Sequence, residues 1–336
     1  MSFTKIAVTG STGHIGNTIV RALLGAGFEV VALYRTPKNA RALDGLSCHH
    51  AQGDLLDDGF LHPHFKQVEA VIHAAGVISV NGDPHGEVWR VNVEGTRKVV
   101  EACLQNGVQK LIHFSSVHAL QYDENTPLIH ENLPLANASA TAYDYSKSMS
   151  ERVVLASVGQ GLNASILNPT AVLGPYDFRG SLQGDMLRRM WTGALPALIN
   201  KGFDWVDVRD VANAALLALQ KARPGERYLI GGRWATPREL AEISAGFTGQ
   251  KPPQIVVPIW VARLGLPFMW LYEKMTGRAP LYTGEMLRIL AHANPRLSTQ
   301  KARTALGYRP RQLEVSLRDT YDWMVAQGWL PGASSR

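Results

Sequence analysis

The sequence has almost no cysteine. Cys48 and Cys103 are the only two among 336 residues, and neither belongs to a CxxC pair or to a Cys/His cluster at metal-ligand spacing. A disulfide framework and a structural zinc site are therefore not expected, and we expect no metal to take part in function.

A secretory leader is also not expected. The first residues, MSFTKIAVTGS, pass directly into an expected strand and a glycine-rich turn, without a positively charged segment followed by an apolar one. We therefore expect the protein in a reducing cytoplasm.

Charge is sparse and scattered. Charged residues make up 18% of the chain, and the net charge of +6 comes from basic residues that form no long run. We expect no nucleic acid partner, and the positive excess favours an anionic small ligand. The apolar fraction of 46% is enough for a large core and argues against global disorder.

Only one long hydrophobic run is present. Residues 255–272 read IVVPIWVARLGLPFMWLY, about the minimum length of a bilayer span. Arg263 lies near its centre and two prolines interrupt it, so we predict a core or lid helix and no integral membrane span. A weak contact with a membrane surface is the alternative.

The first half of the chain alternates apolar runs with helical patterns. Such alternation predicts parallel strands joined by helical crossovers, hence an α/β fold with a doubly wound sheet. Strands are predicted at 5–10, 28–35, 46–54, 68–76, 109–116 and 162–170, and helices at 14–27 and 87–107. Segment 203–220 reads as a further helix and 227–232 as a further strand of the same sheet.

Beyond Pro169 the alternation weakens and prolines become frequent. This predicts a smaller, mostly helical C-terminal portion, with two helices around a turn at 298–328. We therefore expect a dinucleotide-binding Rossmann domain at 1–169 plus about 203–232. The substrate-binding portion is expected at about 170–202 plus 233–330.

A glycine loop joins the first expected strand to the first expected helix. It reads TGSTGHIG, with Gly10, Gly13 and Gly16. Small residues allow a positive φ, a close approach of the backbone to a pyrophosphate, and tight packing of helix on strand. The helix N-terminus also favours phosphate. The strand–loop–helix context predicts dinucleotide binding by Gly10, Ser11, Thr12, Gly13, His14, Ile15 and Gly16.

The second strand points to the choice of nucleotide. An acidic residue at its end would select NAD, but the chain has Tyr34 and Arg35 there, followed by Lys38. A guanidinium can bind a 2′-phosphate and stack on adenine. We therefore expect NADP(H), with NAD(H) as the alternative.

The loop spacing TGxxGxxG near the N-terminus resembles the extended short-chain dehydrogenase/reductase family. Further segments match that family along nearly the whole chain: GDLLD at 53–57, HAAG at 73–76, VNVEGT at 91–96 and LNPTAVLGP at 167–175. The resemblance implies cofactor contacts from residues in these segments. They are Asp54, Leu55, Ala74, Ala75, Gly76, Asn92, Pro169 and Thr170.

A Tyr-x-x-x-Lys pair is the candidate catalytic motif. Tyr143 and Lys147 are four residues apart, so on a helix they share one face. A nearby ammonium favours the phenolate and lowers the tyrosine pKa, and Lys147 could also hold the nicotinamide ribose. Tyr143 would then give a proton to a carbonyl oxygen during reduction. Comparison with the family's serine motif at the end of the fifth strand places Ser116 in the catalytic set, with Ser115 as the alternative.

Several reactions occur within this family. Dehydratases carry an acidic pair beside the catalytic hydroxyl, where this chain has Val117 and His118. With Val77, these two are expected to border the substrate pocket, and a proton relay through His118 is a further alternative.

The closest resemblance is to the dihydroflavonol reductase-like and 3β-hydroxysteroid dehydrogenase-like branch, which also has a pattern like PLYTGEMLRIL at 280–290. It implies an NADP(H)-dependent oxidoreductase that reduces an apolar or aromatic ketone or aldehyde, with segment 255–272 roofing the pocket. A nucleotide-sugar epimerase with retained NAD(P), using Arg179, Arg188 and Arg189, is the alternative enzyme. A non-catalytic NADP-binding regulator is the alternative from another class. The family also implies a homodimer, paired through the helices that start near 84 and 143.

Overall fold

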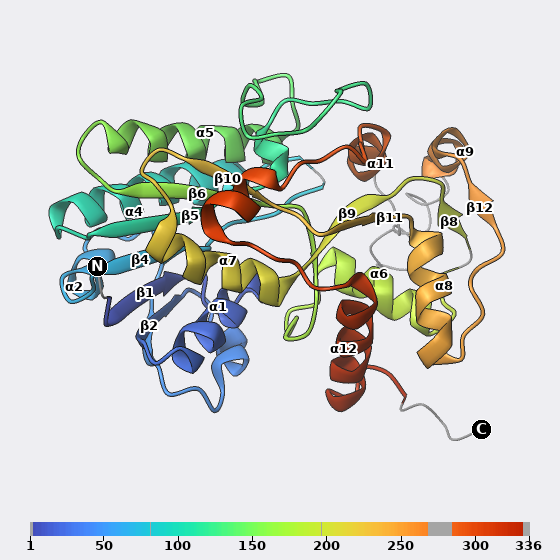
Figure 1. The fold of residues 1–336 in the computed structure, drawn as a ribbon, viewed down its shortest axis with the longest axis horizontal. Coiled ribbons are helices and arrows are strands. Elements are labelled where there is room, and N and C mark those ends of the chain that lie inside the picture. The colour runs from blue at the N-terminus through green and yellow to red at the C-terminus, as the bar shows by residue number, and fades with distance from the viewer. Residues whose placement is uncertain (1–2, 81, 196, 268–283, 332–336) are drawn as a thin grey trace.

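The computed structural model describes residues 3–80, 82–195, 197–267 and 284–331. A seven-stranded parallel sheet runs through its larger part, in the order β10-β6-β5-β4-β1-β2-β3 (Figure 1). The strands are β1 Lys5–Thr9, β2 Glu29–Tyr34, β3 His49–Gln52, β4 Ala70–His73, β5 Lys110–Phe114, β6 Ala164–Pro169 and β10 Arg227–Ile230. The order reverses between β1 and β4, as in the Rossmann fold, so the predicted fold class is confirmed.

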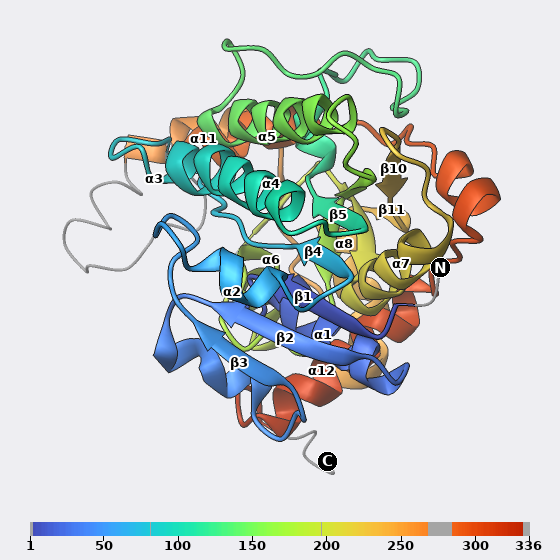
Figure 2. The same cartoon turned by 90° about the vertical axis from the view of Figure 1, so that its left-hand side faces the viewer.

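Helices cover both faces of this sheet (Figure 2). One face carries α1 (His14–Gly25) and α7 (Val208–Lys221), which pack on each other. The other carries α2 (Leu61–Phe65), α4 (Gly95–Gln105) and α5 (Ala142–Val158).

Alternate side chains along a strand pack into the cores on opposite faces of the sheet. Ile6 and Val8 of β1 belong to the core beside α1 and α7, whereas Ala7 between them belongs to the core beside α4 and α5. Because successive side chains of a strand point in opposite directions, a sheet covered on both faces needs continuous apolar strands. This explains why the central strand segments, such as β1 and β4, show no polar alternation.

The expected helix at 87–107 is one helical segment with a local irregularity. It begins as α3 (Glu87–Trp89), passes through a π-helical turn η2 (Arg90–Glu94) and continues as α4. Asn92 lies in the π-helical turn. α4 and α5 lie side by side, and their use as a dimer surface stays a prediction.

The smaller part contains several helices and two small sheets. Its core is aromatic and aliphatic, and includes Trp191, Trp205 and Tyr321. The helices are α6 Leu182–Trp191, α8 Pro237–Thr248, α9 Ile259–Leu264, α11 Gly284–Ala291 and α12 Leu313–Ala326. The small sheets consist of β7 Ala171–Leu173, β9 Phe203–Asp207 and β11 Arg233–Ala235, and of β8 Leu198–Ile199 with β12 Val256–Val257. Short turns of helix are η1 Pro37–Leu43, η3 Val117–Ala119 and η4 Ala302–Leu306.

The prediction of one helix at 203–220 is wrong in its first part. Residues 203–207 form β9, which pairs with β7 and β11, and α7 starts only at Val208. Asp207 ends the strand and caps the helix, because its carboxylate accepts a hydrogen bond from the Arg209 N–H. The partner strands are remote in sequence, so the local pattern could not show this pairing.

The apolar segment 255–272 is described only to residue 267. Its described part forms β12 and α9, and Trp260 and Leu264 are exposed. None of residues 255–267 lines the cavity described below, so the expected roof is not built from them. Residues 268–272, and 280–283 of the PLYTGEMLRIL pattern, lie outside the described part. No helix in the described ranges is both long and apolar enough to cross a membrane.

Gly16 has no room for a side chain. A Cβ on Gly16 would lie 2.1 Å from the Gly10 carbonyl oxygen, whereas a Cβ on Gly25, in the same helix, would meet nothing within 4 Å. We expect Gly16→Ala to lower the free energy of unfolding by about 1–3 kcal/mol in urea melts. The control Gly25→Ala should change it by less than about 1 kcal/mol. Equal effects of the two substitutions would contradict this account of the loop.

Candidate active site

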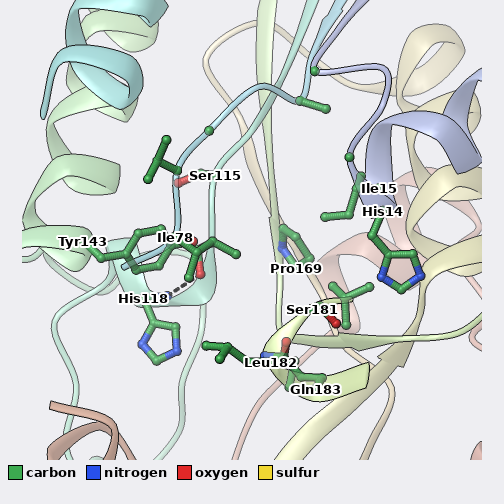
Figure 3. Close-up of a pocket in the computed structure, with 18 of the residues that line it drawn as sticks. His14, Ile15, Ile78, Ser115, His118, Tyr143, Pro169, Ser181, Leu182 and Gln183 are labelled. Carbon is green, nitrogen blue, oxygen red and sulfur yellow. Dashed lines mark hydrogen bonds between the residues drawn. The ribbon is translucent and has the colours of Figure 1, made fainter. Parts of the chain in front are cut away.

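A cavity of about 650 Å³ opens at the carboxyl ends of the sheet strands, where the smaller part of the chain faces them. Figure 3 shows part of its lining, with residues from the glycine loop, the end of β5, α5 and the start of α6. Most of the predicted site residues line it: Gly10, Thr12, Gly13, His14, Ile15, Gly16, Tyr34, Arg35, Asp54, Leu55, Ala74, Ala75, Gly76, Val77, Ser116, Val117, His118, Tyr143, Pro169 and Thr170. Ser11, Lys38, Asn92 and Lys147 are not in the lining.

The glycine loop packs its backbone against the end of β4. Gly10 has φ +66°, and a Cβ there would lie 2.6 Å from the Ala75 backbone. The Gly13 N–H donates to the Gly10 carbonyl at 2.9 Å. No side chain caps the start of α1, at the cavity, so the N–H groups of its first turn have no side-chain acceptor. This backbone arrangement fits a pyrophosphate, which needs N–H donors and no obstructing side chains.

A loop from the smaller part lies across the glycine loop. His14 Nε2 is 3.0 Å from the Pro175 carbonyl, and the Asn17 amide donates to the Tyr176 carbonyl at 3.0 Å. Tyr176 has φ 70°, which is unusual for a residue with a side chain, and the Arg21 guanidinium lies over its ring at 4.7 Å. No local pattern in the sequence predicts this contact, because it joins residues 161 and 159 positions apart.

The end of β2 holds Arg35 between two carboxylates. Its guanidinium lies 3.8 Å from Asp54 and 3.4 Å from Glu87. All three side chains are partly exposed, so these pairs contribute little to stability and a ligand anion can compete for the guanidinium. Glu87 was not predicted here.

Other residues near Arg35 differ from the prediction. Lys38 is exposed on η1 and does not reach the cavity, whereas Thr36 and Asn39 of the same loop line it. Short polar residues in a turn after a strand are common, so nothing in the sequence separated these two from Lys38.

Two predicted cofactor residues support the lining from behind. The Ser11 hydroxyl is buried and donates to the Leu33 carbonyl at 3.0 Å. The Asn92 amide oxygen accepts from the Val77 N–H at 2.8 Å, and its amide nitrogen donates to the Val77 carbonyl and the Ser146 hydroxyl, each at 2.9 Å. Asn92 thus ties the loop after β4 to α5.

Ser116, Tyr143 and Lys147 come together beside the cavity. Ser116 follows β5 and caps η3, where its hydroxyl accepts from the His118 N–H at 3.2 Å. The Ser116 hydroxyl also acts on Tyr143, whose pKa it lowers. Lys147 is buried behind Tyr143, and its ammonium donates to the Phe114 carbonyl at 2.7 Å.

The pKa values of this pair are shifted in opposite directions. Burial raises the pKa of Tyr143 to about 12, and the Ser116 hydroxyl opposes that rise. Burial lowers the pKa of Lys147 to about 8, and the Glu151 carboxylate opposes that fall. The expected lowering of the tyrosine pKa is therefore not present in the protein alone, because burial outweighs the favourable contacts.

The substrate side of the cavity is largely apolar with a few polar groups. His118 Nδ1 lies 3.7 Å from the Asp144 carboxylate, and the His118 ring is 6.4 Å from the Tyr143 ring, centroid to centroid. Burial raises the pKa of Asp144, and His118 opposes that rise. The apolar walls come from segments far apart in the sequence, including Ile78, Met186, Phe203, Trp234, Ile289 and Leu297. The sequence did not point to any of these six.

Thr170 lies at the junction of the two parts. Its hydroxyl donates to the Asp204 carboxylate at 2.8 Å and its N–H to the Ile230 carbonyl at 3.2 Å. Pro169 ends β6 beside it. Among the described residues, no group of three or more His, Cys, Asp or Glu side chains could hold a metal ion.

The model of the NAD dependent epimerase/dehydratase family matches residues 6–231. The chain belongs to this family. It is the extended short-chain dehydrogenase/reductase family that the glycine loop and the Tyr-x-x-x-Lys motif indicated, and the chain is an NAD(P)-dependent oxidoreductase of that type.

Two known proteins from the comparison align with almost the whole length of this chain. "Sterol demethylase protein B" of Methylococcus capsulatus is 31% identical, covering 96% of this chain and 99% of the relative. "Putative dihydroflavonol 4-reductase" of Synechocystis is 30% identical, covering 96% and 95%. The solved structure of gox2253 superposes with a TM-score of 0.83 at 29% identity, covering 97% and 99%.

Asn92 should matter for stability although it does not line the cavity. Asn92→Leu leaves the Val77 N–H and carbonyl and the Ser146 hydroxyl without this partner, so we expect a loss of about 2–3 kcal/mol in the free energy of unfolding. Asn106→Ala, which removes one hydrogen bond to the Ala102 carbonyl, is the control and should cost about 1 kcal/mol. Urea melts of both variants measure the difference, and an Asn92 effect no larger than the control would refute the role.

Proposed function

We propose that the protein is an NADP(H)-dependent oxidoreductase that interconverts a ketone or aldehyde and an alcohol on an apolar or aromatic substrate. The observation that carries the proposal is that Ser116 and Tyr143 line one largely apolar cavity together, with the Lys147 ammonium buried beside them. The names of the relatives, a sterol demethylase protein and a dihydroflavonol reductase, agree with an apolar polycyclic or aromatic substrate.

The residues suggest how the reaction would proceed. A bound nicotinamide would supply or accept the hydride. During reduction Tyr143 gives its proton to the substrate oxygen, and Ser116 holds that oxygen by a hydrogen bond. Lys147 provides the positive charge that favours the phenolate left behind. In alcohol oxidation the same groups act in reverse, with Tyr143 as the base.

The preference for NADP(H) rests on Arg35. The end of β2 carries Tyr34 and Arg35 and no acidic residue. The Arg35 guanidinium is partly exposed, so a 2′-phosphate could bind to it. Asp54 and Glu87 lie near the guanidinium and would have to release it, so NAD(H) is the alternative cofactor.

A nucleotide-sugar epimerase is the second candidate, and the family's name favours it. Its substrate diphosphate would need free cations in the cavity. Arg188 and Arg189 are both held at 2.6 Å by Asp185, which leaves Arg179 as the one of these three arginines in the lining. This arrangement supports the reductase more than the epimerase.

We further propose that the chain has a cofactor-binding part and a substrate-binding part. Residues 1–169 and about 203–232 would bind the cofactor, and about 170–202 and 233–330 would bind the substrate. A homodimer through α4 and α5, a cytoplasmic location and a weak membrane contact of segment 255–272 stay predictions.

Nucleotide identity separates the two enzyme candidates. The purified protein would be denatured and any released nucleotide identified by mass spectrometry, beside fluorescence titrations with NADPH and NADH. An exchangeable site that prefers NADPH supports the reductase. Stoichiometric, retained NAD would support the epimerase and overturn the proposal.

Tyr143→Phe should remove the proton donor and keep the fold. We expect turnover of an aromatic ketone with NADPH to fall by about 10²–10⁴-fold while NADPH binding is retained. In the unmutated enzyme, alcohol oxidation should quicken and ketone reduction should slow as pH rises, because the two directions need Tyr143 in opposite protonation states. Steady-state rates across pH check both statements, and full turnover by Tyr143→Phe would exclude Tyr143 as the acid.

Arg35→Ala should change the choice of cofactor. We expect the Kd for NADPH to rise about tenfold or more and the Kd for NADH to change little, because only the 2′-phosphate loses a charge-assisted contact. Lys38→Ala, an exposed cation outside the cavity lining, is the control and should leave both values unchanged. An unchanged NADPH/NADH ratio in Arg35→Ala would remove the basis for NADP(H).

A further inference from the structure

A third ionisable residue continues the face of α5 that carries Tyr143 and Lys147. Glu151 lies four residues beyond Lys147, so the three side chains project at helical spacing toward the sheet. Glu151 is fully buried, with 0% of its surface exposed. A buried carboxylate is costly unless charged or polar groups satisfy it, so its partners indicate its role.

The partners of Glu151 lead directly to Ser116. The Asn168 amide nitrogen, on β6, donates to Glu151 Oε1 at 2.5 Å and to the backbone carbonyl of Ser116 at 2.9 Å. Asn168 thereby joins the middle of α5 to Ser116, which lines the cavity together with Tyr143. The Arg227 guanidinium, on β10, approaches Glu151 Oε2 at 3.2 Å.

Arg227 is thus within ion-pair distance of this buried carboxylate, and Lys147 lies one turn earlier on the same helix. Burial raises the pKa of Glu151, whereas Ser115, Arg227, Asn168 and Lys147 all oppose that rise.

Nearby histidines add no charge at neutral pH. Burial lowers the pKa of His73 to about 3 and that of His113 well below its usual value, and Lys147 lowers both further. The charged groups around Glu151 are thus Arg227 and Lys147.

Resting on the proposed function, we infer that Glu151 is a positioning residue for the catalytic set. As a carboxylate it keeps Lys147 positively charged inside the protein, and through Asn168 it fixes the backbone of Ser116. Of the two carboxylates one turn away from Lys147 on α5, Asp144 lies 3.7 Å from His118, whereas Glu151 is the one that opposes the effect of burial on Lys147. A neutral Lys147 would no longer favour the Tyr143 phenolate.

Glu151→Gln separates the charge from the geometry. The amide oxygen of glutamine can still accept from Asn168, and Arg227 is partly exposed, with 19% of its side chain accessible, so it can turn to water. The measurement is an ultraviolet titration of the Tyr143 phenolate in the NADP⁺ complex, with the Tyr143→Phe protein subtracted. It needs no substrate.

We expect the midpoint of Tyr143 ionisation to rise by about one pH unit in Glu151→Gln, which is about a tenfold smaller phenolate fraction at a fixed pH. Glu151→Asp keeps the charge, so its Tyr143 midpoint should stay close to that of the unmutated protein. Glu131→Gln is the matched control. Glu131 is also buried, but it accepts a hydrogen bond from the Leu229 N–H. The midpoint of Tyr143 ionisation in this variant should match that of the unmutated protein. Direct repulsion between Glu151 and the phenolate would give the opposite sign, so an unchanged or lower midpoint in Glu151→Gln overturns the inference.

If Glu151→Gln melts too readily to titrate, ¹⁵N NMR of the lysine Nζ atoms in the unmutated protein decides. The inference requires a protonated Lys147 at pH 7, assigned by its response to NADP⁺, and a neutral one overturns it. Neither experiment depends on turnover. A shifted midpoint in a protein that reduces no ketone or aldehyde would refute the proposed function alone.

Discussion

The arrangement of the site depends on one buried ammonium. Lys147 donates to the carbonyl of Phe114 at the end of β5, at 2.7 Å, and so fixes α5 against the edge of the sheet. This contact places Tyr143 beside Ser116, because Ser116 follows the same strand. Burying a cation is unfavourable, and its pKa falls to about 8 for that reason. The charge is tolerable because a carbonyl accepts from it and Glu151 lies on the same helix face.

The parallel sheet is the second constraint. All seven strands point in one direction, so their carboxyl ends and the loops that follow meet at one edge. The glycine loop after β1, Arg35 after β2, Gly76 after β4 and Ser116 after β5 reach the same cavity for this reason. The smaller part of the chain closes the cavity from the other side with mostly apolar side chains. One edge thus combines polar backbone for a cofactor with an apolar wall for a substrate.

Sequence reasoning is strongest where a function needs a fixed local spacing. The loop glycines and the Tyr-x-x-x-Lys pair are set within one turn of chain or helix; the glycines and Tyr143 line one cavity, and Lys147 is buried beside it. It failed where a contact joins distant segments. β9 was read as helix because its partners β7 and β11 lie elsewhere in the sequence, and the Glu87 contact with Arg35 spans 52 residues.

The sequence by itself determined the fold class, the family and the motif that carries the candidate chemistry. Apolar periodicity and residue spacing encode these features, because each depends on neighbours within a few positions. Only the tertiary structure decided which side chains wall the substrate cavity, that burial raises the pKa of Tyr143 and lowers that of Lys147, and that Glu151, Asn168 and Arg227 form one network. These features depend on distance and burial in space, which segments acquire only when the sheet and the smaller part pack together.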